Sequence, residues 1–305
     1  MSQLAPEALD EMTGAPPIAR RRGRSLVVRE LKTVLRQSRS VQIGLAIVVL
    51  LFLAGLLAPV LTPYSPIKID LLNTLRTPSW SHPMGTDELG RDQLTRILYG
   101  ARISMVMGLL SVAIASILGA ILGLVAGYTG GVVDNLIMRC MDALLAFPGL
   151  LLALLIISAL GPGLTKILIA FGIGGVPFYA RLLRSMVLSI REREFVEAAH
   201  ALGASRMRVM LRHVLPNSIS PLIIATSLAM GLVIVGLAGL GFLGLGAQPP
   251  TPEWGAMLSG SQARFFTAPW LLITPGAVIL AAVVGYTLLG DGLRDALDPR
   301  LRQSQ

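Results

Sequence analysis

The chain has 305 residues, of which 53% are hydrophobic and only 14% are charged, and its mean hydropathy is +0.70. A soluble protein of this length could not bury so much apolar sequence, so the composition excludes a soluble domain and indicates an integral membrane protein. The net charge of +9 does not predict a nucleic-acid partner, because the basic residues flank apolar segments instead of forming one patch.

The first 40 residues form a basic segment that we interpret as a flexible cytoplasmic tail. They hold eight Lys and Arg residues. A secretory signal peptide is excluded, because the segment is too long and the apolar run after it can cross a full bilayer. We expect the charges to act as a topology signal, and an arm that binds nucleic acid or lipid is the less favoured alternative.

Six segments are long and apolar enough to cross a bilayer, which takes about 20 residues. In chain order they comprise residues 41–62, 103–127, 135–160, 164–188, 218–246 and 270–289. We therefore predict an all-α integral membrane protein with six transmembrane helices. A loop of residues 63–102 separates the first transmembrane helix, 41–62, from a core of five helices within residues 103–290.

The distribution of basic residues orients these helices. The segment from Arg181 to Arg212 holds seven Lys and Arg, and the tail 291–305 holds three. Six crossings place these two regions on the same side as the basic N-terminal tail, and the positive-inside rule makes that side cytoplasmic. The loop 63–102 carries five basic residues, which weakens the asymmetry without reversing it. We expect both termini in the cytoplasm and this loop on the opposite side of the membrane.

A charged segment, residues 82–104, leads into the second predicted transmembrane helix. Thr86 or Asp87 is expected to cap a short helix there. Asp92 and Arg96 lie four residues apart, so we expect them to form an ion pair across one helical turn.

The third predicted transmembrane helix, 135–160, contains two charges near its start. Arg139 and Asp142 are three residues apart, so we expect them to neutralise each other. We interpret them as a lock between helices near the inner membrane surface, and a polar feature of a transport path is the alternative. Pro148 is expected to bend this helix.

Glycines and tryptophans mark the last third of the chain. Six glycines within residues 231–246 give the fifth helix a smooth face, which indicates close helix packing more than gating. Trp254 and Trp270 are expected to anchor the chain at the outer membrane interface. In the tail 291–305 we predict a short cytoplasmic helix that Pro299 ends.

The polar segment 191–217 is the most informative part of the sequence. Its apolar residues recur at helical spacing in two groups. The groups consist of Phe195, Ala198, Ala199 and Leu202, and of Met207, Met210, Leu211 and Val214. Gly203 can end the first helix in a left-handed backbone conformation, Ser205 can cap the second, and Pro216 is expected to end it. The pattern predicts a helix–turn–helix at the membrane surface.

Within this segment, Glu197-Ala198-Ala199 is followed at fixed spacings by Gly203, His213 and Leu215-Pro216. This arrangement resembles the EAA loop of ABC-importer permeases, in which Glu-Ala-Ala precedes Gly, an apolar residue and Leu-Pro at the same distances. His213 stands where the general pattern has an apolar residue. The form RHVLPN is similar to the variant of the dipeptide, oligopeptide and nickel importer branch.

The resemblance implies a type I ABC importer permease fold and a non-catalytic subunit that imports di- or oligopeptides, with nickel or another small solute as the alternative. It also implies a second similar permease subunit, two subunits that bind ATP and Mg, and an extracytoplasmic solute-binding protein. The residues that it places against an ATPase subunit are Glu197, Ala198, Ala199, Gly203, Ser205, Met207, Met210, Leu211 and Pro216. Glu197 is expected to make the charged contact, and Gly203 to hold the bend.

Other activities lack their sequence signals. No Gly-Lys dipeptide occurs, so the chain has no phosphate loop and is predicted to bind no nucleotide cofactor itself. The single cysteine, Cys140, and the set His82, Asp87 and Asp92 lack the spacing of a metal site. An ion-driven secondary transporter is the rival hypothesis, but such proteins usually carry carboxylates near mid-membrane, which are almost missing here. A membrane-anchored scaffold fits six crossings less well.

Overall fold

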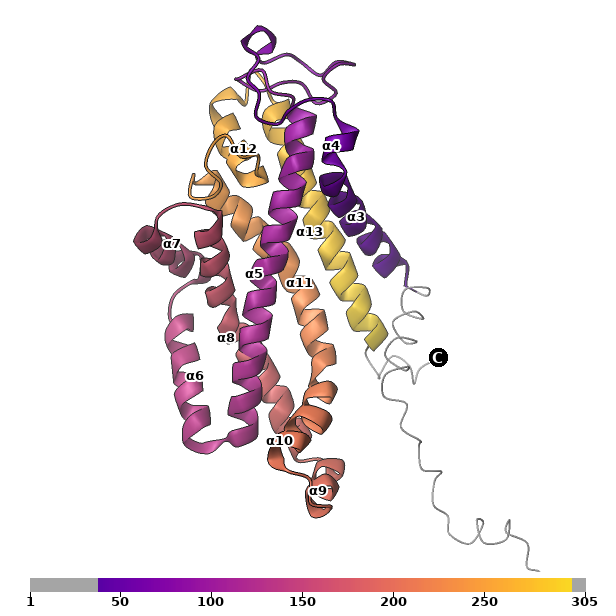
Figure 1. The fold of residues 1–305 in the computed structure, drawn as a ribbon, viewed down its shortest axis with the longest axis vertical. Helices are drawn as coiled ribbons and strands as arrows, with labels where there is room; N and C mark the ends of the chain where they lie inside the picture. The colour runs from indigo at the N-terminus through magenta and orange to yellow at the C-terminus, as the bar shows by residue number, and fades with distance from the viewer. Residues whose placement is uncertain (1–37, 298–305) are drawn as a thin grey trace, which may run out of the picture. The chain divides into compact units, whose positions relative to one another are not determined.

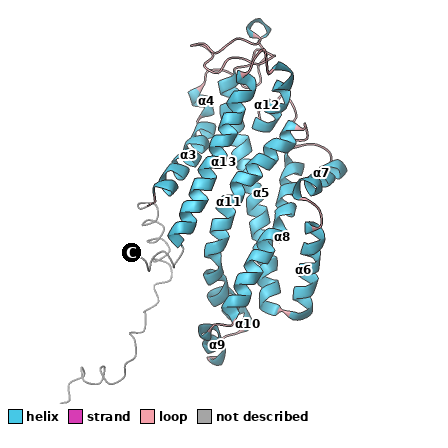
Figure 2. Cartoon of the chain, turned by 180° about the vertical axis from the view of Figure 1, so that it is seen from behind, coloured by secondary structure: helices cyan, strands magenta, loops and turns pink. Residues whose placement is uncertain are grey.

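The computed structural model describes residues 38–297, and these residues are almost entirely helical (Figures 1 and 2). Five helices are long and apolar enough to cross a membrane, and a bent pair of helices adds a sixth crossing if the pair is one span. The long helices are α3 (Arg39–Leu56), α5 (Gln93–Thr129), α8 (Leu164–Arg191), α11 (Leu215–Phe242) and α13 (Trp270–Leu297). The predicted all-α membrane fold is confirmed.

Shorter helices lie in the connections. They are α4 (Ala58–Leu61), η1 (Leu71–Asn73), α9 (Glu194–Ala201), α10 (Arg206–Val209), η2 (Met210–Val214), α12 (Trp254–Ser261) and η3 (Gln262–Arg264). Within the described residues, α9 and α12 lie at opposite ends of the helix bundle (Figure 1), and we call these the α9 end and the α12 end. The predicted tails fall largely outside residues 38–297.

The third predicted crossing is broken. It consists of α6 (Gly131–Leu145) and α7 (Gly149–Leu160), which meet at an angle of 87°. Pro148 is the N-cap of α7, with ψ at 135°. A proline disfavours the helical conformation of the residue before it, so the chain leaves the helix between Leu145 and Gly149. The expected bend at Pro148 is confirmed, and it is sharp enough to divide the predicted crossing over 135–160 into two helices.

Two of the long helices, α5 and α8, approach each other closely. Gly119, Gly123 and Gly127 recur every four residues on α5 and face α8. A Cβ atom at Gly119 would lie 2.7 Å from the carbonyl oxygen of Val176, and one at Gly123 would overlap the carbonyl group of Ala180. Small residues at this spacing let two backbones approach, which matters in lipid because packing, and not the hydrophobic effect, holds helices together there.

The glycines of residues 231–246 serve packing at some positions only. A Cβ atom at Gly236 would lie 2.5 Å from the ring of Phe171, and one at Gly241 would lie 2.5 Å from the carboxylate of Glu253. At Gly239 no atom lies within 4 Å of such a Cβ. The packing interpretation is therefore confirmed at Gly236 and Gly241.

Two ion pairs fasten α6 to α8. Arg184 binds Asp134 through two hydrogen bonds, of 2.5 Å from Nε and 2.6 Å from the terminal nitrogen. Arg181 donates to Asp142 over 2.6 Å. The predicted pair between Arg139 and Asp142 is wrong, because α8 brings Arg181 to Asp142 and the Arg139 side chain is exposed. Charged pairs thus do hold α6 and α8 together. The two hydrogen bonds of the Arg184 pair also fix how its two side chains are oriented relative to each other.

The cap of α5 differs from the predicted one. Asp92 accepts hydrogen bonds from the backbone N–H of Thr95 (2.8 Å) and from its hydroxyl (2.6 Å), so it is Asp92, and not Thr86 or Asp87, that caps a helix. The helix begins at Gln93, before the predicted start of the crossing at residue 103. Its first turn carries the buried polar side chains of Gln93, Thr95 and Arg96, so hydropathy alone placed the start too late.

The other oxygen of the Asp92 carboxylate lies 2.9 Å from Nδ1 of His82, and both side chains are buried. This contact replaces the predicted ion pair between Asp92 and Arg96. Among residues 38–297, no group of three or more His, Cys, Asp or Glu side chains could hold a metal ion.

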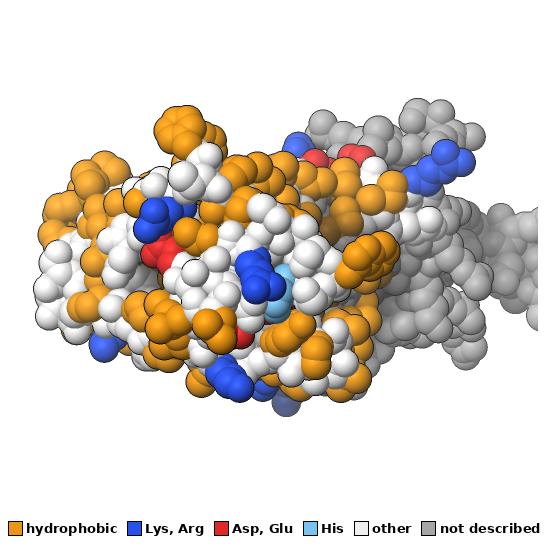
Figure 3. Space-filling view, turned by 90° about the horizontal axis from the view of Figure 1, so that it is seen from above, with side chains coloured by type: hydrophobic (Ala, Val, Ile, Leu, Met, Phe, Trp, Pro, Cys, Tyr) orange, Lys and Arg blue, Asp and Glu red, His pale blue; other side chains and the backbone are white. Residues whose placement is uncertain are grey.

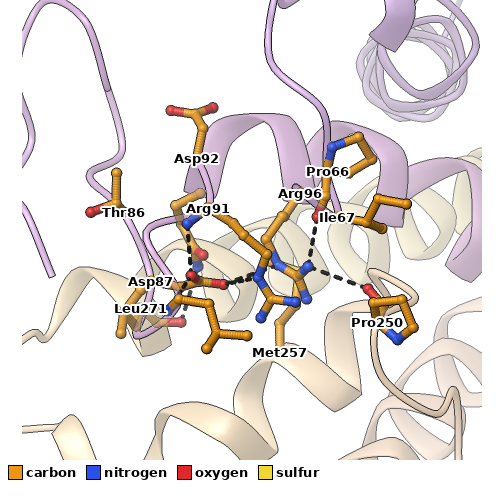
Figure 4. Close-up of polar contacts among 12 residues, drawn as sticks. Pro66, Ile67, Thr86, Asp87, Arg91, Asp92, Arg96, Pro250, Met257 and Leu271 are labelled. Atoms are coloured by element: carbon orange, nitrogen blue, oxygen red, sulfur yellow. Dashed lines mark hydrogen bonds and ion pairs between the residues drawn. The ribbon is translucent and has the colours of Figure 1, made fainter. Parts of the chain in front are cut away.

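Arg96 is buried and ties three segments together at the α12 end (Figure 4). Its Nε lies 3.5 Å from the Asp87 carboxylate, and its terminal nitrogen donates to the carbonyl groups of Pro66 (2.8 Å) and Pro250 (3.4 Å). Arg91 donates to the same Asp87 oxygen over 2.7 Å. A buried guanidinium requires such partners, because an unpaired charge in this position would be strongly destabilising.

Trp254 is a core residue and not the predicted interface anchor. It is 0% exposed, and its indole N–H donates to the carbonyl oxygen of Ile97 over 3.1 Å. Trp270 is half-buried and donates in the same way to Thr86 over 3.3 Å. Trp254 is held inward by α5 and Trp270 by the loop around Thr86, while α12 packs against α11 and α13. In a space-filling view from the α12 end of the molecule, charged side chains lie scattered among hydrophobic ones (Figure 3).

Glu253 is a buried carboxylate at the start of α12. Its two oxygens accept hydrogen bonds of 2.9 Å from the backbone N–H groups of Gly255 and Ala256, and the Ser104 hydroxyl lies 3.3 Å away. Burial raises the pKa of the Glu253 carboxyl above its usual value, although the backbone donors act in the opposite direction.

The last helix is longer than predicted. α13 continues from Trp270 to Leu297, past the predicted end at residue 289. Gly290 and Gly292 keep it close to its neighbours, because Cβ atoms there would meet Leu228 and Val41. The first part of the predicted tail helix is thus continuous with α13, and Pro299 lies outside the described residues.

The α5–α8 contact can be tested with one methyl group. We expect Gly123→Ala to destabilise the protein by about 1–3 kcal/mol, because the new methyl meets the backbone of Ala180. Gly239→Ala is the matched control, since it adds the same methyl to a helix where nothing lies within 4 Å. Thermal unfolding in detergent measures both; equal unfolding temperatures for the two variants would contradict the packing described here.

The burial of Glu253 predicts a pH dependence. Because its folded-state pKa is raised above 4.5, its contribution to stability is complete below that value and is lost as the pH rises through the folded-state pKa. Glu253→Gln removes this titration. We expect the unfolding temperature of the unmodified protein to fall relative to that of the variant as the pH rises from 4.5. A difference that stays constant with pH would show that the carboxylate is not desolvated.

Candidate functional site

The segment 191–217 protrudes from the bundle at the α9 end (Figure 1). Its first arm is α9, which begins at Glu194 and ends at Ala201. Gly203 follows with φ at +81°, and its N–H donates to the carbonyl oxygen of His200 over 2.9 Å. No atom lies within 4 Å of a Cβ atom at Gly203, so the left-handed backbone, and not a lack of space, requires glycine here. The predicted turn is confirmed.

The second arm is not the separate helix that the sequence predicts. Ser205 occupies the N-cap position of α10, but its side chain makes no capping hydrogen bond. α10 passes through the single π-turn η2 directly into α11, and Pro216 lies in the first turn of α11 instead of ending a helix. Proline is compatible with a first helical turn, which explains why the chain continues. The second arm is therefore an extension of a membrane-crossing helix.

Three valines anchor both arms to the bundle. Val196 is 2% exposed, and Val209 and Val214 are each 0% exposed. Around them lie buried residues of α5 and α8, namely Leu124, Leu183, Val187 and Ile190. We call these seven residues the anchor cluster. Because the cluster joins residues of several helical segments, the protruding segment is fixed to the bundle by apolar packing as well as by chain continuity.

The two apolar groups predicted from helical spacing mostly face away from the bundle. Only Val214 among them is buried, whereas Leu202 is 88% exposed and Met207 is 61% exposed. The side of α9 that faces the bundle carries Val196, which is buried. Its neighbour Phe195, which belongs to the predicted apolar group, is exposed. An apolar surface that is open to solvent at the tip of a protruding segment is typical of a contact with another protein.

The residues expected to contact an ATPase lie on this open surface. Exposed side chains or backbone are present at Glu197, Ala198, Gly203, Ser205, Met207, Leu211 and Pro216, while Ala199 and Met210 are half-buried. We call this set the loop surface. The structure thus brings the predicted residues together at one end of the molecule, without showing what binds them.

Two polar contacts that the sequence did not reveal connect the segment to α5. Nε2 of His200 lies 3.3 Å from the hydroxyl of Tyr128, and Arg191 donates to the carbonyl oxygen of Gly127 over 3.0 Å. Both partners lie at the end of α5, more than 60 residues earlier in the chain, so no local pattern relates them.

A cavity of about 690 Å³ lies among α5, α7, α8 and α11. Its walls are almost wholly apolar, with Phe171, Phe178 and Leu232 among the larger side chains. The polar side chains in its lining are Ser111, Tyr179 and, from α13, Arg294. A cavity of this size and composition is in the range of small-molecule sites.

Known proteins share this architecture. Residues 119–303 match the family described as "Binding-protein-dependent transport system inner membrane component", and residues 29–78 match the "N-terminal TM domain of oligopeptide transport permease C". In crystals of the inward-facing MetNI methionine ABC transporter, one chain superposes with a TM-score of 0.53, covering 67% of this chain and 97% of that chain at 18% identity. At that identity the likeness shows the fold alone.

The closer relatives extend over nearly the whole chain. The dipeptide transport system permease protein DppC of Alkalihalophilus pseudofirmus is 47% identical over 274 residues, which cover 90% of each chain. DppC of Haemophilus influenzae is 41% identical over 88% of this chain and 93% of its own length. The fold is thus that of a multi-pass ABC importer permease. The chain belongs to the family of binding-protein-dependent transport system inner membrane components, in its peptide-permease branch.

The anchor cluster predicts which residues of the segment are structural. We expect Val209→Ala to lower the free energy of unfolding by about 2 kcal/mol, because it removes two buried methyl groups. Leu202→Ala removes more apolar atoms from an exposed position and should change stability by less than about 0.5 kcal/mol. Thermal unfolding measures the stability of both variants. An equal loss of stability in the two would contradict the burial described.

Proposed function

We propose that this chain is the peptide-conducting permease subunit of an ATP-driven importer in a bacterial inner membrane. The observation that carries the proposal is the identity of 47% to a dipeptide permease along 90% of both chains. Similarity over such a length includes the membrane-crossing helices as well as the protruding segment. Nickel, the alternative cargo, is not favoured by the two DppC relatives, which are both named for dipeptide transport.

The partners follow from the architecture of such importers. We propose that a second, similar permease subunit completes the transport path, that two ATPase subunits bind and hydrolyse ATP with Mg, and that an extracytoplasmic solute-binding protein delivers the cargo. The α9 end then faces the cytoplasm, as do both chain termini, and the loop of residues 63–102 lies outside. The excess of basic residues in the segment from Arg181 to Arg212 supports this orientation.

The loop surface supports a mechanical role. Glu197 and the exposed Met207 and Leu211 provide one charged and two apolar contacts for a cleft on an ATPase subunit. Behind them, the second arm is tied to the bundle by the anchor cluster and by the unbroken helical path from α10 through the π-turn into α11. A displacement of the loop surface by an ATPase would therefore move α11 and press on α8. ATP shifts the equilibrium of the permease because the ATPase subunits bind it with different affinity in their two states.

The test is a charge reversal at the loop surface. In proteoliposomes that hold the complete transporter, we expect Glu197→Arg to lower peptide-stimulated ATP hydrolysis and uptake at least about tenfold, the equivalent of one lost charge-assisted contact. Glu88→Arg, at the α12 end, is the control, since Glu88 is exposed and its ion pair with Arg264 is superficial.

Normal assembly of the Glu197→Arg complex with unchanged uptake would contradict the role of the loop surface. The cargo is tested in the same vesicles, where unlabelled dipeptides should compete with labelled dipeptide and a nickel chelate should not. Competition by the chelate alone would contradict a peptide cargo. Uptake by the isolated chain, without ATPase subunits, would contradict the importer itself.

A further inference from the structure

Two residues that line the cavity among α5, α7, α8 and α11 have buried hydroxyl groups without a hydrogen bond of ordinary geometry. Ser111 is 1% exposed and Tyr179 is 2% exposed, and neither hydroxyl has a partner among the described residues. Both residues line the cavity. A buried polar group without a partner destabilises the state that contains it, so such a group calls for an explanation.

Ser111 departs from the behaviour of similar residues in this chain. A serine or threonine inside a helix usually donates to the carbonyl group one turn earlier. Ser218, Thr226 and Ser227 do so on α11, over 2.9, 2.6 and 3.1 Å. Ser111 makes no such bond, so its hydrogen remains for another acceptor.

Tyr179 is placed by the close contact of α5 with α8. Its Cβ lies against Gly119, at 2.5 Å from the position of an added Cβ there, and its ring packs in the apolar core. The Thr226 hydroxyl of α11 lies close enough to the phenol to interact with it, but it donates to Leu222 over 2.6 Å and makes no hydrogen bond of ordinary geometry with the phenol. A residue needed only for packing at this position would be phenylalanine, since the phenol oxygen contributes no bond here.

The rest of the lining restricts the chemistry of a ligand. Apart from Arg294, which is exposed and lies in the last turns of α13, the lining contains no charged side chain. Two hydroxyls in an apolar chamber can bind a neutral polar group through one or two hydrogen bonds. The backbone amide is the neutral polar group that all peptides share, whatever their side chains.

We propose that the hydroxyls of Ser111 and Tyr179 hydrogen-bond the backbone amide of a short peptide as it passes through this cavity. The inference rests on the proposed function, which supplies the peptide. Both hydroxyl oxygens are covered by neighbouring atoms in the present arrangement, so the bonds form when the surrounding helices shift. Pro177 on α8 and Pro221 on α11 interrupt the backbone hydrogen bonding of two of these helices and mark where they can bend.

The test deletes the hydroxyls alone. Tyr179→Phe and Ser111→Ala are made in the complete transporter, with Ser116→Ala as the control on the same helix, because the Ser116 hydroxyl is already bonded to Ala113 and lies outside the cavity lining. With saturating binding protein, uptake of a labelled dipeptide should fall about two- to tenfold in each of the two variants, the equivalent of one neutral hydrogen bond. The control should match the unmodified transporter.

Two further measurements separate a cargo contact from a structural one. The unfolding temperature and the yield of assembled complex should not fall in Tyr179→Phe or Ser111→Ala, because neither deletion breaks a bond within the protein. A cargo in which an ester replaces the backbone amide should be imported more slowly than the amide by the unmodified transporter, and the two cargoes should become more nearly equal in the variants.

Three outcomes would overturn the inference: unchanged uptake in both variants, a loss of assembly that accounts for the lost uptake, or an amide-to-ester ratio that the variants do not alter. The second outcome would assign the hydroxyls to the interface with the neighbouring permease subunit. An unmodified transporter that imports no dipeptide would instead contradict the proposed function, and with it this inference.

Discussion

The close contact between α5 and α8 is the constraint on which the rest of the structure depends. Gly119 and Gly123 let the two backbones meet, and each functional region is built along the resulting pair. Midway along the pair, Ser111 and Tyr179 lie in the lining of the cavity. At its α9 end, the same two helices supply Leu124, Leu183, Val187 and Ile190 to the anchor cluster. Because packing in a protein interior is dense, a shift of one region of this pair is transmitted to the others.

The two ends of the bundle are built differently. At the α12 end, Arg96, Asp92 and Glu253 are buried with their hydrogen bonds largely satisfied, so this end is held by a polar network that is costly to break. At the α9 end an apolar anchor cluster holds the protruding segment, and the outward surface carries exposed apolar side chains such as Leu202. The polar network favours an α12 end that stays closed. The exposed apolar surface favours binding of the α9 end to another protein.

The sequence predicted the crossings and the protruding segment because both depend on local pattern. Hydropathy over about 20 residues identifies a crossing, and the requirement of a left-handed backbone at Gly203 can be inferred from its neighbours. Prediction failed where partners are distant in the chain. Asp142 pairs with Arg181 and not with Arg139, and Trp254 is buried against Ile97, because tertiary packing chose these partners. The glycines of α5, spaced by four residues, carry a helix-packing signal that could have been read from the sequence.

The central claim is that the protruding segment and the first turns of α11, before the bend point at Pro221, move as one body, so that movement at the loop surface changes the cavity. Distance measurement by electron paramagnetic resonance tests it most directly, with spin labels in the complete transporter after replacement of the exposed Cys140. One pair of labels at Met207 and Ile219 spans the π-turn, and a second pair at Phe178 and Leu232 spans the cavity rim, all four side chains being exposed. Between nucleotide-free and ATP-bound states, the first distance should stay constant while the second changes. A change across the π-turn with a constant cavity rim would contradict the account.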